Sequence, residues 1–323
     1  MSGDRVVALT GATGFLGPHL VAALARDGAR VRMLARRPAN LEHWARHELW
    51  RGVALDVVPG HLEDMRALER LTTGADAVVH AAGAIKARDR AAFLRTNGDG
   101  TRAVAEASRR CAPDARFVAV SSLAAREPQL SDYAASKRAG EAAALAAYGD
   151  APDRLVIVRP PAIYGPGDRE TLAIFKAASR AVVPVFGSGR AAIIHVADAA
   201  AAIARLALGA GEAGRYSLSD TNPGGYGLAE LLSEAGRAVG RTPRFVRIPD
   251  GILLAAGTAS AWWGRLGGQA PIFTAGKARE MLHPDWSVAA ADALPAGIYQ
   301  AKIGISEGFR QTVAWYRAAG WLA

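Results

Sequence analysis

The sequence predicts an α/β fold, a doubly wound parallel sheet joined to a smaller, mostly helical C-terminal domain. In the first half, short apolar runs of strand length alternate with segments of amphipathic helical pattern. This alternation is typical of βαβ units, whose parallel sheet is covered by helices on both faces. Beyond about residue 160, loops rich in glycine and proline interrupt the pattern, and the later segments are mainly helical.

Each element of the predicted sheet follows from a short apolar run, and each helix from a 3.6-residue period. The sequence predicts strands within 5–11, 30–36, 53–60, 75–83, 115–122 and 153–165. It predicts helices within 15–28, 65–74, 100–111, 131–141, 195–208 and 304–322. Gly28 is expected to end the first helix, because glycine readily takes the backbone conformation that follows a helix.

Composition excludes several classes of protein. Hydrophobic residues make up 50% of the chain and charged residues 21%, which is the composition of a globular protein. Cys111 is the single cysteine, so neither a disulfide nor a cysteine-based metal site is expected, as suits a reducing cytoplasm. The sequence begins without a signal-peptide pattern, and its longest apolar stretch, 251–264, is too short and glycine-broken to span a bilayer. We therefore expect a cytoplasmic protein with no metal and no membrane span.

The net charge of +9 is spread through the sequence and does not form basic runs with interleaved aromatic residues. A nucleic-acid-binding protein usually concentrates its arginines and lysines in such a patch. We therefore expect no nucleic-acid partner, and an anionic small molecule is the preferred use for part of this charge.

The segment TGATGFLG, residues 10–17, lies between the first strand and the first helix. Glycines at these spacings allow a tight turn, the close approach of a phosphate and close packing of helix on strand. The helix N-terminus adds free N–H groups and a partial positive charge, so the segment predicts a pyrophosphate-binding turn of a Rossmann-type domain. The residues predicted to contact the dinucleotide here are Gly11, Thr13, Gly14, Phe15, Leu16 and Gly17.

The end of the second strand indicates which dinucleotide is bound. An acidic residue there would favour NAD, but the strand is followed by Arg36 and Arg37. A guanidinium is a planar, bidentate partner for a 2′-phosphate, so the sequence predicts a preference for NADP(H), with NAD(H) possible. The alternative is that both arginines begin a solvated loop.

Tyr133 and Lys137 are four residues apart and therefore share one face of a helix. An ammonium and an oxidised nicotinamide near a phenol would favour the phenolate and lower its pKa from about 10. Tyr133 could then exchange a proton with a substrate, while Ser121 or Ser122, at the carboxyl end of a strand, holds the substrate oxygen. Considered without the other segments, Tyr133 and Lys137 could instead lie on an ordinary surface helix with no catalytic role.

Together these segments resemble the extended short-chain dehydrogenases/reductases, the NAD-dependent epimerase/dehydratase group. The resemblance covers nearly the whole chain and lies in seven segments: TGATGFLG, VVHAAG, TNGDGT, VAVSS, YAASK, RPPAIYGPGD and IIHVADAA. It implies Tyr133 as the acid/base, Lys137 as the residue that lowers its pKa and holds the nicotinamide ribose, and Ser122 as the residue that orients the substrate. It also implies cofactor contacts from Ser121, Leu62, His80, Ala81, Ala82, Pro160 and Ile163, and mainly structural roles for Asn97, Arg159 and His195.

Three departures from the family pattern bear on function. His61 stands where the family usually has an acid that holds the adenine, so this contact stays open. The serine strand continues as SSLAAR, without the Thr-Asp-Glu-like triplet of dehydratases, which disfavours dehydration. Ser122 and Tyr133 are joined by a short connection without the Val-Tyr-Gly insertion of nucleotide-sugar epimerases, as in reductases and in NADPH-binding accessory subunits related to respiratory complex I.

We therefore expect an NADP(H)-dependent oxidoreductase that acts on a carbonyl or secondary alcohol. The alternatives are an epimerase with tightly bound NAD and a non-catalytic NADPH-binding scaffold or assembly protein. The dinucleotide domain is expected over 1–163 and about 190–218, and the substrate domain over about 164–189 and 219–323. Trp262 and Trp263 could line a pocket or a dimer surface, and a homodimer is expected only by analogy with the family.

Overall fold

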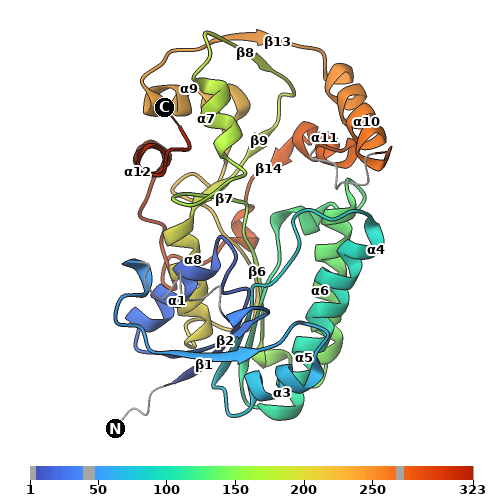
Figure 1. The fold of residues 1–323 in the computed structure, drawn as a ribbon, viewed down its shortest axis with the longest axis vertical. Coiled ribbons are helices and arrows are strands. Elements are labelled where there is room, and N and C mark those ends of the chain that lie inside the picture. Colours follow the sequence, from blue (N-terminus) through green and yellow to red (C-terminus); the bar gives the residue numbers. More distant parts are fainter. Residues whose placement is uncertain (1–4, 39–47, 267–272, 323) are drawn as a thin grey trace.

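The computed structural model describes residues 5–38, 48–266 and 273–322, with the side chains of 261–266 left aside. Its centre is a seven-stranded sheet in the order β11-β6-β5-β4-β1-β2-β3 (Figure 1). All pairs in this sheet are parallel, as the alternating sequence pattern predicts. The strands are β1 (Val6–Thr10), β2 (Arg30–Ala35), β3 (Leu55–Pro59), β4 (Ala77–His80), β5 (Arg116–Val120), β6 (Leu155–Arg159) and β11 (Gly214–Ser217).

Helices cover both faces of the sheet because successive strand residues point to opposite sides. Val7 and Leu9 of β1 pack into one apolar core, whereas Ala8 between them packs into the other. The first core includes residues of α1 (Gly17–Arg26) and α8 (Val196–Ala207). The second includes residues of α3 (Met65–Thr72), α5 (Gly100–Cys111) and α6 (Asp132–Ala147). Five predicted strands and the predicted helices of this part are thereby confirmed. The sixth predicted strand, within 153–165, is split: β6 ends at Arg159, and residues 162–164 form a strand of another sheet.

The seventh strand, β11, was not expected from the sequence. Its residues GRYS form no apolar run, and the first two are exposed. The strand is short and lies at the edge of the sheet, where one side needs no partner, so pairing with β6 suffices to hold it.

The remaining elements form a second region at the top of Figure 1. The helices here are α7 (Leu172–Ala178), α9 (Leu228–Val239), α10 (Asp250–Leu266), α11 (Ala275–Leu282) and α12 (Ile305–Ala318). Three small sheets accompany them: β10 with β7, β12 with β9 and β14, and β13 with β8. Their strands are β7 (Ala162–Tyr164), β8 (Val182–Val185), β9 (Arg190–Ala191), β10 (Ile193–His195), β12 (Tyr226–Gly227), β13 (Arg244–Arg247) and β14 (Asp285–Trp286). Most of these strands are too short to be recognised in a sequence. For this region the sequence predicted only a mostly helical character and the final helix, which the structure places at α12.

This region has its own apolar core, built around Tyr164, Phe175, Phe309 and Tyr316. The Phe309 ring lies edge-on to both Tyr164 and Phe175, with ring centroids 5.0 Å and 4.9 Å apart. Such aromatic packing fixes α7 and α12 against each other. No helix within the described residues is long and apolar enough to cross a membrane.

Candidate functional site

The three glycines of the first turn have different surroundings. Gly11 has a positive φ of 82°, and a Cβ there would lie 2.6 Å from backbone atoms of Ala81 and Ala82. A Cβ on Gly17 would lie 2.3 Å from the Ala12 carbonyl oxygen. Both positions therefore require glycine for close packing of the turn.

Gly14 is exposed and open, since a Cβ there would meet only the Gly11 oxygen, at 3.4 Å. No side chain caps the N-terminus of α1, and its first turn carries no acid. The Gly14 and Gly17 N–H groups bond to the Gly11 and Gly14 carbonyls within the turn. The missing side chain at Gly14 and the uncapped end of α1 let an anion approach the backbone and the positive end of the helix. The turn thus fits the pyrophosphate of a dinucleotide.

The predicted adenosine side of the site lies at the carboxyl ends of β2 and β3. Arg36 and Arg37 are both exposed directly after β2. His61 is also exposed, and its Nδ1 accepts a hydrogen bond from the Glu63 backbone N–H at 3.3 Å. Leu62 is partly buried and packs against the core next to α5. Neither the Arg36 nor the Arg37 guanidinium forms an ion pair with the residues that the structure describes, so both could meet a phosphate.

The side chain of His80 is part of the scaffold. It is 2% exposed, with Nδ1 2.8 Å from Thr10 Oγ1 and Nε2 3.1 Å from Thr101 Oγ1. Burial, and secondarily the Lys137 charge, lowers the pKa of His80 to about 3. The neutral imidazole thus links β1, β4 and α5. Ala81 and Ala82 follow it and line the glycine turn at Gly11.

Asn97 lies in a π-helical turn, Leu94–Asp99, just before α5. Its Nδ2 donates to Ser136 Oγ at 2.8 Å and to the Ala84 carbonyl at 2.9 Å, while its Oδ1 accepts from the Ala84 N–H at 2.7 Å. The amide therefore joins the loop after β4 to α6. This agrees with the structural role implied by the family resemblance.

Ser122, Tyr133 and Lys137 meet at the carboxyl end of β5. Ser131 caps the N-terminus of α6, and this fixes the first turn of the helix that carries Tyr133 and Lys137. The Ser122 hydroxyl lies close enough to the Tyr133 phenol to lower its pKa. Lys137 Nζ donates to the Val120 carbonyl at 2.7 Å.

Burial dominates the electrostatics of this cluster. It raises the pKa of Tyr133, against a smaller lowering by the Ser122 hydroxyl, and the Glu280 charge adds to the rise. Burial also lowers the pKa of Lys137 to about 8, although Glu141 opposes this. The lowered pKa that we expected for Tyr133 from the sequence depended in part on the charge of a bound oxidised nicotinamide. In the protein alone, the phenol is held protonated at neutral pH.

The Ser121 side chain points away from this cluster. Its Oγ donates to Glu141 Oε1 at 2.6 Å, and Arg159 makes two bonds to the same carboxylate, at 2.7 Å and 2.6 Å. The side chains of Arg159 and Glu141 are only 4% and 2% exposed. Ser121 thus bonds to a buried ion pair that ties β5 and β6 to α6. Its side chain is directed to Glu141, so its geometry does not support a side-chain contact with a cofactor.

A carboxylate from the second region was missed by the sequence reasoning. Glu280 of α11 is 7% exposed and accepts a hydrogen bond from Ser131, at the start of α6. Lys277 Nζ lies 3.2 Å from the other Glu280 oxygen. Arg126 strengthens the junction by donating to the carbonyls of Asp285 and Ser287 at 2.5 Å and 2.6 Å. Nothing in the sequence connects Glu280 with Tyr133, because Glu280 lies 149 residues beyond Ser131 in the chain.

The other predicted residues lie where β6 passes into the second region. Pro160 is buried and its carbonyl accepts from the Leu123 N–H at 2.8 Å, while Ile163 of β7 packs against the sheet core. His195 is 3% exposed, and its Nδ1 caps α8. Its Nε2 has no hydrogen-bond partner among the described residues. His195 is therefore buried as its structural role requires, but only one of its two ring nitrogens has a hydrogen-bond partner among the described residues.

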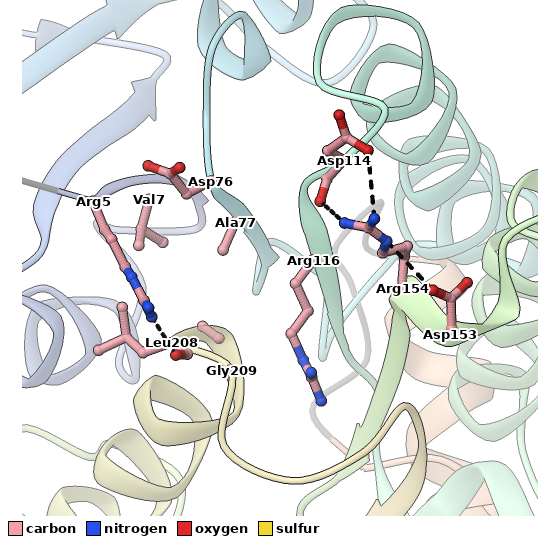
Figure 2. Close-up of a pocket in the computed structure, with 11 residues that line it drawn as sticks. Arg5, Val7, Asp76, Ala77, Asp114, Arg116, Asp153, Arg154, Leu208 and Gly209 are labelled. Atoms are coloured by element: carbon pink, nitrogen blue, oxygen red, sulfur yellow. Dashed lines mark hydrogen bonds and ion pairs between the residues drawn. The ribbon is translucent and has the colours of Figure 1, made fainter. Parts of the chain in front are cut away.

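A cavity of about 330 Å³ lies at the other end of the strands, where their amino ends meet (Figure 2). Its charged lining includes Arg5, Asp76, Arg116, Asp114 and Arg154. Arg154 pairs with Asp114, and Arg116 donates to two backbone carbonyls. Parallel sheets bind ligands at the carboxyl ends of their strands, so this cavity is separate from the predicted site.

Comparison with known proteins fixes the family. Residues 7–217 match the model of the NAD dependent epimerase/dehydratase family. The chain belongs to this family. Over 319 residues it is 50% identical to a protein named ceramide reductase from Caulobacter vibrioides, covering 98% of this chain and 96% of the relative. It is thus an NAD(P)-dependent enzyme of the oxidoreductase and epimerase class.

Solved structures support the fold of this family member. A UDP-glucose 4-epimerase from Bifidobacterium longum, in complex with NAD⁺ and UDP, superposes with a TM-score of 0.72 at 17% identity, covering 98% of this chain and 99% of the other. A dTDP-glucose 4,6-dehydratase from Bacillus anthracis, in complex with NAD, gives a TM-score of 0.70 at 17% identity, covering 99% of each chain.

Proposed function

We propose that this enzyme is an NADPH-dependent reductase that converts a ketone on a ceramide-class lipid into a secondary alcohol. The main support is the 50% identity to the ceramide reductase over nearly the whole of both chains. Nicotinamide-dependent enzymes reduce ketones readily, whereas an amide carbonyl is a poor hydride acceptor. The reacting group is therefore a ketone on the hydrocarbon chain of such a lipid, and not the amide.

Tyr133 acts as the proton donor in this proposal. The reduced nicotinamide, when bound, supplies a hydride to the carbonyl carbon. Tyr133 gives its phenolic proton to the carbonyl oxygen, and Ser122 donates a hydrogen bond to the same oxygen as it gains negative charge. The raised pKa of Tyr133 suits this direction, since the phenol carries its proton at neutral pH.

Lys137 and the glycine turn would hold the cofactor. An ammonium has three donors, and one Lys137 donor is used on the Val120 carbonyl. The others would bind the nicotinamide ribose. Gly14 and the N-terminus of α1 would bind the pyrophosphate, and Arg36 and Arg37 the 2′-phosphate that distinguishes NADPH from NADH.

The test is cofactor oxidation by the purified enzyme with a keto-ceramide in detergent micelles. We expect NADPH to be consumed in step with formation of the secondary alcohol, and NADH to be used more slowly. A nucleotide sugar serves as the contrasting substrate. Epimerisation of the sugar without net cofactor consumption, together with no reduction of the lipid, would overturn the proposal in favour of an NAD-retaining epimerase.

A further inference from the structure

One end of the second region exposes apolar side chains on a small sheet. β8 and β13 pair in parallel, with Val182 opposite Arg244 and Pro184 opposite Val246. Paired residues point to the same side of a sheet, so these four share its outer face. The intervening residues pack into the core of this region. Val182 and Val246 are 52% and 51% exposed, although they are apolar.

Helix α10 follows β13 in the chain and lies at the same end of the molecule (Figure 1). Ile252, Ala255, Ala256 and Ala259 are all exposed, and their spacing of three, four and seven residues places them on one stripe. The opposite side of the helix packs through Gly257 against the backbone of Thr274. A surface helix normally presents polar residues to solvent, so an apolar stripe here indicates a contact surface.

The charges around these apolar residues are mostly positive. Between residues 241 and 260 the single acid is Asp250, whose Oδ1 accepts from the Gly187 N–H at 2.8 Å. Exposed arginines border the surface: Arg180, Arg241, Arg244 and Arg247. None of these four forms an ion pair with any residue that the structure describes. An apolar centre within a cationic border complements an anionic lipid surface.

We propose that this end of the molecule, which we call the docking end (Val182, Pro184, Val246, Ile252, Ala255, Ala256 and Ala259 with the bordering arginines), binds to anionic bilayers. The docking end lies at the top of Figure 1, far from the N-terminus. It rests on the bilayer surface and inserts only side chains, in keeping with the lack of a spanning helix among the described residues.

Bilayer binding would serve the proposed reaction. Helix α10 packs against α11, whose Glu280 contacts Ser131 at the start of the helix that carries Tyr133. A bilayer under α10 therefore lies near the reacting cluster, where a water-insoluble lipid could reach it. This last step rests on the proposed function, whereas binding to the bilayer does not.

The experiment is vesicle flotation of the full-length protein without cofactor or substrate. One set of vesicles contains phosphatidylcholine and phosphatidylglycerol in equal parts, and the other phosphatidylcholine alone. We expect binding to the anionic set that weakens as salt is added. Ile252→Asp and Val246→Asp should each weaken it by roughly tenfold or more, and Arg244→Glu with Arg247→Glu should abolish it.

Matched controls lie on the nucleotide-binding side. Leu145→Asp removes an apolar residue that is 47% exposed on α6, and Arg215→Glu reverses an exposed charge on β11. Neither should alter flotation, and thermal unfolding should show all variants folded. Equal losses in the controls would overturn the proposal. So would a wild-type protein that fails to float but forms a dimer that Ile252→Asp dissociates, because the docking end would then be a subunit contact. Flotation with no lipid reduction would instead refute the proposed function alone.

Discussion

The two sides of Tyr133 are held in different ways. On one side, Ser122, Lys137 and Asn97 come from the sheet and its adjoining helices, and the hydrogen bonds of Lys137 and Asn97 join elements close in the sequence. On the other side, Glu280 reaches Ser131 across 149 residues of chain. We propose that the first side carries the chemistry. The second is built by the region that would select the substrate, so chemistry and selectivity can vary separately.

The largest expected effect concerns the first side. Tyr133→Phe removes the proton donor, and we expect kcat to fall by about 10²–10⁴-fold while the NADPH dissociation constant stays unchanged. Steady-state kinetics and cofactor titration measure the two quantities. Tyr216→Phe on β11, which removes a phenol that donates to the Glu212 carbonyl, is the matched control. Full turnover by Tyr133→Phe would favour the non-catalytic scaffold.

The buried ion pair beneath the cluster should dominate stability. Arg159→Met leaves the Glu141 carboxylate buried without its cation, and we expect a loss of about 3–5 kcal/mol in the free energy of unfolding. Denaturant titration measures this. Arg154→Met, at a more exposed pair with Asp114, should cost less than about 1 kcal/mol. Similar losses in both variants would show that burial of the first pair is unimportant.

Glu280→Ala tests the second side. It removes a buried charged acceptor from Ser131 and Lys277, so we expect the unfolding free energy to fall by about 1.5–3 kcal/mol. The Michaelis constant for the lipid should rise, with NADPH affinity preserved. Glu234→Ala removes a comparable but more exposed carboxylate that binds Ser306, and it should change neither property much. An unchanged lipid Michaelis constant in Glu280→Ala would show that Glu280 of α11 does not contribute to substrate binding.

Arg36→Ala with Arg37→Ala tests cofactor choice. Both guanidinium groups are exposed at the end of β2, and their loss should weaken NADPH binding about tenfold, or 1.4 kcal/mol, with NADH binding unchanged. Calorimetric titration of both cofactors measures this. Arg51→Ala removes another exposed arginine and should have no effect. Equal weakening of NADPH and NADH would contradict a specific 2′-phosphate contact.

A change of pH should alter kcat/KM less than these substitutions do, and the direction of the change can be stated. Lys137 has a lowered pKa of about 8, so its positive charge is present below that pH and is lost above it. The raised pKa of Tyr133 keeps the phenol protonated over this range. We therefore expect kcat/KM to fall as pH rises through about 8, and Lys137→Arg to move the fall to higher pH. A profile that stays flat well above pH 8 would contradict this assignment.

The sequence predicted six of the seven strands of the central sheet and the shared helix of Tyr133 and Lys137, because these features follow from local patterns. Apolar runs fix strands, and the spacing of Tyr133 and Lys137 fixes a common helix face. It could not predict that Ser121 is directed to Glu141, because two adjacent serines differ only in which side of the chain they face. Glu280 and the short strands of the second region also depend on tertiary contacts. Trp262 and Trp263 have side chains outside the described residues, so their role stays a prediction.

The most direct test of the account follows the hydride itself. The enzyme is incubated with a keto-ceramide and NADPH that carries deuterium at the transferred position of the nicotinamide, and the lipid product is analysed by mass spectrometry. We predict a secondary alcohol with deuterium on the carbinol carbon in the wild-type enzyme, and far less of this product from Tyr133→Phe in the same time. Unlabelled lipid with no loss of NADPH, while the same enzyme epimerises a nucleotide sugar, would contradict it.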